Sequence, residues 1–186
     1  MDQFSIDVEG NSPSTGPTME VWDPIVRLFH WTVVGGCILN LFILEEGKYW
    51  HRVTGYIIAA VLVVRLLWGV VGTRYARFSQ FFPTRRKIVE HLQDLREGRT
   101  NRHIGHSPLG AVMMLVLMTL LTLSCLTGWL MGTDAFWGNK SLESIHALSG
   151  NAIMVLALLH AASAIFEGWR LQENLVWSMV TGKKRK

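Results

Sequence analysis

Four long apolar runs constrain this chain of 186 residues more than any other feature. A helix needs about 20 predominantly apolar residues to cross the roughly 30 Å hydrocarbon core of a bilayer, and each run meets that requirement. The short alternating segments of a membrane β-barrel do not occur. We therefore predict an integral membrane protein, with spans at Ile25–Leu44, Val53–Gly72, Pro108–Met131 and about His146–Gly168.

The connections between these spans predict how the helices are arranged. The connections expected at Glu45–Trp50 and Gly132–Ile145 are short, so the spans that they join run antiparallel. The predicted fold class is therefore all-α, an integral membrane up-down four-helix bundle. Two helix starts are marked by a capping side chain before a proline, at Asp23-Pro24 and Ser107-Pro108.

The basic residues are distributed unevenly among the connections, and this predicts an orientation. Only Lys48, Arg52 and Lys140 lie in the first and third connections. The second connection and the tail hold Arg74, Arg77, Arg85, Arg86, Lys87, Arg96, Arg99, Arg102, Arg170 and residues 183–186. By the positive-inside rule, the second connection and both termini face the cytoplasm. These residues flank membrane spans without an aromatic platform, so nucleic acid is not an expected partner.

Outside the spans, the chain divides into an arm and a tail. Residues 1–23 lack Lys and Arg and have no apolar core, so we expect a flexible acidic arm rather than a cleavable signal peptide. This arm could also dock a partner. Residues 170–186 form a basic tail. The stretch Arg85–Glu97 has apolar residues at helical spacing, which predicts a surface helix at the lipid headgroups, and the start of the tail could form another.

The spans carry histidines at two depths. His146 and His160 lie fourteen residues apart, which places them on one helix face, within about 40° and about 21 Å apart along the axis. His30 falls at the depth of His160, and His51 at the depth of His146. Polar residues inside a span usually face the bundle interior and are functional candidates. One such histidine alone could simply bond a carbonyl, but matched pairs indicate two stacked metal centres.

Paired imidazoles are suited to haem. Two neutral imidazoles fill both axial positions of haem iron, which favours electron transfer over oxygen chemistry. The chain has no C-x-x-C-H motif for covalent attachment. The sequence therefore predicts two non-covalent b-type haems within residues 24–169. The inner haem is expected between His30 and His160, and the outer haem between His51 and His146.

Three further residues are candidate cofactor contacts at the inner level. Arg65 lies fourteen residues after His51 and needs an anion if buried, for which a haem carboxylate is the natural partner. Arg27 lies one turn before the first-span histidine and could bind a haem carboxylate or reach lipid phosphate. His106, at the entry to the third span, could bond a propionate or a quinone carbonyl, or cap the helix.

The motifs that carry these residues resemble the prokaryotic cytochrome b561 family and the related cytochrome b subunits of nickel-iron hydrogenases. They are Val21-Trp22-Asp23-Pro24, Arg27-Leu28-Phe29-His30-Trp31, His51-Arg52-Val53-Thr54-Gly55-Tyr56, Arg65-Leu66-Leu67-Trp68-Gly69, Gly105-His106-Ser107-Pro108-Leu109-Gly110, His146-Ala147 and Leu159-His160. The resemblance covers nearly the whole chain after the arm. It implies a bundle in the bacterial inner membrane with two b haems, held by the same two histidine pairs, that exchanges electrons with quinone and a respiratory redox partner.

These observations leave more than one function open. The leading interpretation is a di-haem electron carrier between membrane quinone and a partner such as a periplasmic c-type cytochrome. The alternative is a stand-alone superoxide:quinone oxidoreductase, in which Lys48, Arg52 and Lys140 attract the anion. The protein is thus an electron-transfer protein or at most a quinone oxidoreductase, and a homodimer stays open. A metal transporter is disfavoured because the spans lack acidic ligands and Arg65 would repel a cation.

Overall fold

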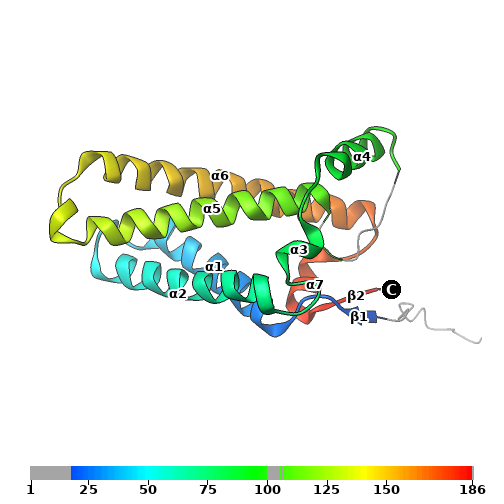
Figure 1. Cartoon of the computed structure of the whole chain (residues 1–186), viewed down its shortest axis with the longest axis horizontal. Helices are drawn as coiled ribbons and strands as arrows, with labels where there is room; N and C mark the ends of the chain where they lie inside the picture. The colour runs from blue at the N-terminus through cyan, green and yellow to red at the C-terminus, as the bar shows by residue number, and fades with distance from the viewer. Residues whose placement is uncertain (1–17, 100–104, 106, 186) are drawn as a thin grey trace, which may run out of the picture.

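Four long helices dominate the computed structural model, which describes residues 18–99, 105 and 107–185 (Figure 1). They are α1 (Pro24–Ile38), continued by the π-helix η1 (Leu39–Ile43), then α2 (Tyr49–Val71), α5 (Pro108–Met131) and α6 (Lys140–Arg170). All four are long and apolar enough to cross a membrane. The predicted all-α membrane bundle is thereby confirmed.

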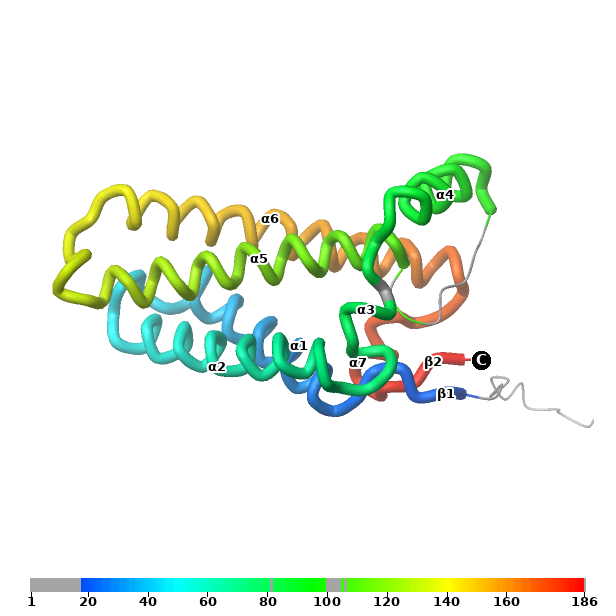
Figure 2. The backbone as a smooth tube through the Cα atoms, viewed as in Figure 1, coloured from blue at the N-terminus to red at the C-terminus, as the bar shows by residue number. Residues whose placement is uncertain are grey.

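The four long helices lie along the long dimension of the molecule, and successive helices run in opposite directions, as the tube view in Figure 2 shows. α1 packs on α2, α2 on α5, and α5 on α6. Their shared core is formed by apolar side chains of α2, α5 and α6, namely Ile58, Leu62, Met118, Leu121 and Ile153. α1 adds only partly buried residues to this core, among them Val33 and Cys37.

Most of the helix surface faces outward. In the most apolar window of each span, only 11 to 22 % of the residues are buried inside the protein. A soluble bundle of this size would bury a full apolar stripe on every helix. The outward surface is therefore suited to contact with lipid.

The helix starts follow their capping side chains. Asp23 and Ser107 each accept a hydrogen bond from the main-chain N–H three residues later, and each precedes a proline, as predicted. α6 begins at Lys140, earlier than predicted, because the Asn139 side chain caps it by accepting from the N–H groups of Ser141 and Leu142. His146 therefore lies inside α6 rather than at its start.

The two ends of the described chain meet at one end of the bundle, called here the sheet end (Figure 1). Strand β1 (Thr18–Glu20) pairs antiparallel with β2 (Lys183–Arg185). Helix α7 (Leu175–Thr181) leads into β2 through Gly182, whose φ of +82° favours glycine. We expected residues 18–23 to be part of a flexible arm. In the structure they instead form strand β1, which is paired with β2, and lead into the N-terminal cap of α1.

The connection between α2 and α5 also lies at the sheet end. It contains the short helix α3 (Phe78–Phe81) and the helix α4 (Arg85–Arg96), which agrees with the predicted helix to within one residue. α4 packs against α5 and leaves Val89 and Leu92 exposed. Its position at the lipid headgroups stays a prediction. At the opposite end, α5 and α6 are joined through the 3-10 helix η2 (Asp134–Phe136).

The carboxylate of Asp23 ties α1 to the end of α2. Its Oδ1 accepts from the Val26 N–H at 2.9 Å, and its Oδ2 accepts from Trp68 Nε1 at 2.9 Å and from the Thr73 hydroxyl at 2.6 Å. Burial raises the pKa of this carboxyl, but the hydrogen bonds outweigh burial and hold the pKa below its ordinary value of 3.8. The folded protein therefore favours the charged carboxylate.

We expect Asp23→Ala to destabilise the protein by about 1–3 kcal/mol, because it removes a helix cap and two further hydrogen bonds. A carboxyl with a depressed folded pKa stabilises the fold above its unfolded pKa, and this contribution is lost as the pH falls through the folded pKa. The difference in the free energy of unfolding between wild type and variant should therefore be largest at neutral pH and should vanish in strong acid. Thermal unfolding in detergent across pH measures it.

The matched control is Asp134→Ala, which removes an exposed aspartate of η2 at the opposite end. It should leave the melting temperature within error of wild type. If the difference in melting temperature between Asp23→Ala and wild type stayed constant into strong acid, the charged carboxylate would not be the source of the stability.

Candidate functional site

His51 and His146 face each other at the end of the bundle opposite the sheet. His51 comes from the first turn of α2 and His146 from α6, and their ring centroids lie 6.2 Å apart with ring planes inclined by 67°. An imidazole nitrogen binds a metal ion at about 2 Å, and the ring centre lies about 1 Å behind it, so two rings that share one ion have centres roughly 6 Å apart. The pair has the spacing that one metal ion requires.

The surroundings of His146 orient its ring. Its Nδ1 lies 3.1 Å from the Ser124 carbonyl oxygen and 3.1 Å from the hydroxyl oxygen of buried Thr127. Donation from Nδ1–H to the Ser124 carbonyl leaves the Nε2 lone pair free to bind a metal. A Cβ at Gly128 would lie 3.1 Å from His146 Cε1, so the ring lies directly on the α5 backbone.

His51 has a different environment. Its Nδ1 is buried and has no hydrogen-bond partner among the described residues. The side-chain amide of Asn40, in η1, donates from Nδ2 to the His51 carbonyl oxygen at 3.2 Å. Sequence reasoning missed Asn40, although a polar residue within an apolar span is the signal that could have found it.

His30 and His160 form the second pair, nearer the sheet end. His30 lies in the second turn of α1, and His160 lies on α6. The His30 ring meets Trp31 edge to face, with centroids 5.0 Å apart. Its Nδ1 is buried without a hydrogen-bond partner in the described part of the chain. The structure thus brings His51 and His146 together as predicted, and the ligand role of all four histidines stays a prediction.

Arg65, which we predict to lie at the inner level, is the most deeply buried charged side chain among the described residues, at 2 % exposure. Its Nη2 donates to the Ala76 carbonyl at 3.2 Å, and its guanidinium lies 4.9 Å from the Phe78 ring centroid. The carboxylate of Asp23 acts on it only through longer-range attraction. Its Nη1 is buried without a partner among the residues described. A buried charge that lacks one donor contact fits an anionic ligand.

Arg27 and His106 are the other two predicted cofactor contacts. Arg27 donates from its guanidinium to the main-chain oxygen of Val180 and so joins α1 to α7, while its Nε is buried without a partner in the described chain. Its contact with a haem carboxylate or with lipid phosphate stays a prediction. His106 lies outside the described residues. Beside it, the Gly105 carbonyl accepts a hydrogen bond from Lys184 Nζ at 3.3 Å, which brings the tail to the entry of α5.

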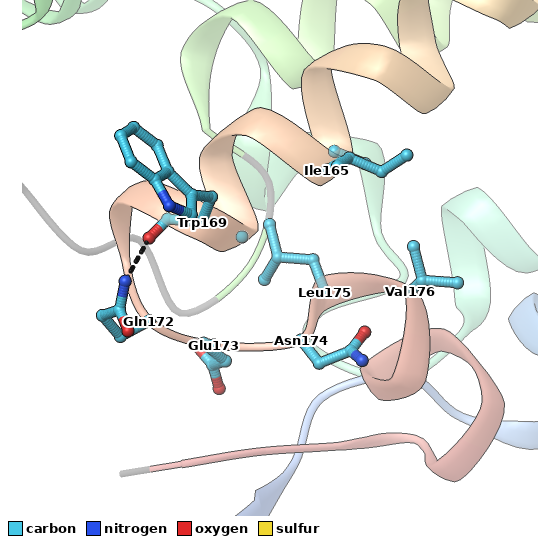
Figure 3. Close-up of a pocket in the computed structure, with 9 residues that line it drawn as sticks. Ile165, Trp169, Gln172, Glu173, Asn174, Leu175 and Val176 are labelled. Carbon is cyan, nitrogen blue, oxygen red and sulfur yellow. Dashed lines mark hydrogen bonds between the residues drawn. The ribbon is translucent and has the colours of Figure 1, made fainter.

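A pocket of about 460 Å³ lies where α6 meets α7 (Figure 3). Its walls include Trp169 and Val176, and its polar side chains are engaged locally. Gln172 donates to the Trp169 carbonyl, Glu173 accepts from the Arg185 N–H, and Asn174 caps α7. None of the predicted site residues lines it, so the pocket is separate from the histidine pairs.

Comparison with known proteins points to one family. Residues 21–182 match the sequence profile of the family described as "Prokaryotic cytochrome b561". The chain is 23% identical to a "Probable Ni/Fe-hydrogenase B-type cytochrome subunit" of Bradyrhizobium diazoefficiens, over 98% of this chain and 92% of the relative. A protein of the same name from Rhodobacter capsulatus is 24% identical over 88% of this chain and 80% of the relative. No solved structure matches the chain significantly.

Gly128 offers a test of the His51–His146 geometry. We expect Gly128→Val to displace the His146 ring, because even a Cβ there would lie 3.1 Å from the ring. Disturbing the support of a metal ligand typically weakens affinity by about 10–100-fold. Haem bound per chain, measured as the pyridine haemochrome, should therefore fall.

Gly35→Val is the matched control, because a Cβ at Gly35 meets no atom within 4 Å. It should leave haem content unchanged. Wild-type haem content in Gly128→Val would argue that His146 binds no haem.

Proposed function

The chain belongs to the prokaryotic cytochrome b561 family, and we propose that it holds two b-type haems at two levels of the membrane and passes electrons between quinone and a redox partner. Family membership makes the protein a b-type cytochrome of electron transport in a bacterial membrane. The observation that carries the finer proposal is the arrangement of the histidines. His51 and His146 face each other with ring centroids 6.2 Å apart, and His30 on α1 and His160 on α6 lie nearer the sheet end of the same bundle.

The residues of both levels fit b-type haem. Haem iron supplies one-electron chemistry when bound. Two imidazoles at each level would fill both axial positions, so neither level keeps an open position for oxygen or another substrate. The unpartnered Nη1 of Arg65 is suited to a propionate. Such a site is built for electron transfer rather than for making bonds.

The redox partner is proposed to dock at the end opposite the sheet. The relatives are named as hydrogenase subunits, so a hydrogenase is one candidate, and a periplasmic c-type cytochrome is another. Exposed aromatic side chains lie on this end near the outer histidine pair, among them Tyr49, Trp50 and Trp137. The basic connection is at the sheet end, so the positive-inside rule supports our proposal that the sheet end and both termini face the cytoplasm.

Quinone is proposed to react near the inner pair, with His106 as a hydrogen-bonding and proton-carrying residue. The alternative of a stand-alone superoxide:quinone oxidoreductase depends on positive charge at the opposite end. There, Lys140 is paired with Glu143 at 2.7 Å, which reduces the charge available to attract an anion. We therefore favour the electron carrier.

The ligand assignment is tested by replacing one histidine at a time. His30→Ala and His160→Ala should each remove the inner haem and spare the outer one. His51→Ala and His146→Ala should each remove the outer haem and spare the inner one. Each variant should hold about half of the wild-type haem, because a b-type haem is held by its axial ligands and packing alone. Haem content and redox titration measure this. Simultaneous loss of both haems in a folded variant, or retention of both, would refute the two-level assignment.

Arg65→Leu should lower the midpoint potential of the inner haem, because a nearby positive charge favours the reduced state. A tenfold change in the oxidation equilibrium corresponds to about 59 mV for one electron. Arg65→Lys, which keeps the charge, should stay closer to wild type. Redox titration followed in the visible spectrum separates these outcomes, and equal potentials in wild type and Arg65→Leu would remove Arg65 from the haem site.

A further inference from the structure

Asn40 lies in an unusual turn of the first span. The N–H of Leu44 donates to the Leu39 carbonyl at 2.8 Å, five residues back, which defines the π-helix η1. Single π turns are rare within α-helices and occur frequently at functional sites. The wider turn directs its side chains differently from an uninterrupted α-helix. In η1 it coincides with an amide side chain, which is costly to bury in an apolar span without a purpose.

Two buried polar atoms near this turn lack partners. Within the described chain, neither Asn40 Oδ1 nor His51 Nδ1 has a hydrogen bond. The two residues are already joined, because Asn40 Nδ2 donates to the His51 carbonyl at 3.2 Å. An unpaired buried polar group lowers the stability of the folded protein. One acceptor and one potential donor on neighbouring side chains can satisfy each other by rotation of those side chains.

We propose that Asn40 is a positioning residue for His51, with Asn40 Oδ1 accepting a hydrogen bond from His51 Nδ1–H when the outer haem is bound. This inference rests on the proposed ligand role of His51. The bond selects the tautomer in which Nε2 carries the lone pair that binds iron. It gives His51 the equivalent of the bond that His146 Nδ1 makes with the Ser124 carbonyl. The two rings of the pair are then held from opposite sides, one by η1 and the other by α5.

The hydrogen bond has a consequence beyond orientation. An acceptor at Nδ1 raises the basicity of the imidazole and so stabilises the oxidised iron. Loss of the acceptor should therefore shift the outer haem toward the reduced state. A purely structural role, in which Asn40 only ties η1 to α2 through the His51 carbonyl, would lower the stability of the protein without moving the potential of one haem selectively.

The test is a redox titration of the full-length protein in nanodiscs for Asn40→Leu, Asn40→Ala, Asn40→Gln and Asn151→Leu. Asn40→Leu and Asn40→Ala remove the acceptor and should shift the redox equilibrium of the outer haem toward the reduced form by about three- to tenfold. A tenfold change corresponds to about 59 mV. The inner haem should not move. Asn40→Gln keeps the amide, so its outer haem should have a potential between those of Asn40→Leu and the wild type. Asn151 is an exposed asparagine on α6 five residues after His146, and its replacement should match wild type.

His51→Ala separates the failure of this inference from the failure of the proposed function. If His51→Ala loses the outer haem while Asn40→Leu and Asn40→Ala titrate like Asn151→Leu, the role of Asn40 is wrong and the ligand assignment stands. If His51→Ala keeps both haems, the ligand assignment fails and the inference fails with it. An equal shift of both haems in the Asn40 variants would indicate a structural role and also overturn the proposal.

Discussion

The absence of water from the hydrocarbon core is the constraint on which the rest of this structure depends. Main-chain groups in the spans must be satisfied internally, which leaves helices as the spanning elements, and each polar side chain there needs a partner or a ligand. The hydroxyls of the spans bond to nearby carbonyls, as Thr119 and Ser163 do. Within the described spans, buried groups without a hydrogen-bond partner remain on Arg27, His30, Asn40, His51 and Arg65, and Asn40 is bonded to the main chain of His51.

The two ends of the bundle are built differently. At the sheet end, the carboxylate of Asp23, the β1–β2 pair and the contact of Lys184 with Trp22 and Gly105 join segments that are far apart in the chain. At the other end, only short connections join the helices, and large aromatic side chains are exposed there. One end is thus closed by segments close to the protein's own termini, and the other is the end at which we propose that a redox partner docks.

The histidine pairs also differ in how their rings are supported. His146 is held by the backbone and side chains of α5, which interact with its Nδ1 and pass close beneath its ring at Gly128. His30 is instead flanked by Trp31, whose indole N–H donates to the main chain of α7. Hydrogen bonds to an axial imidazole and burial of the site both tune haem potentials. The two haems that we propose would share the same kind of ligand and could still differ in potential.

Local patterns in the sequence determined the four spans, the caps at Asp23 and Ser107, the helix at Arg85–Arg96 and the pairing of histidines by depth. These features depend on length, hydropathy and helical period, which act within a few turns of one chain segment. Only the tertiary structure decided that the two termini pair as β1 and β2, that Arg65 lies over Phe78, and that a π turn brings Asn40 to His51. Those contacts join residues that are distant in the chain or depend on one extra residue in a helical turn, and neither effect leaves a periodic signal in the sequence.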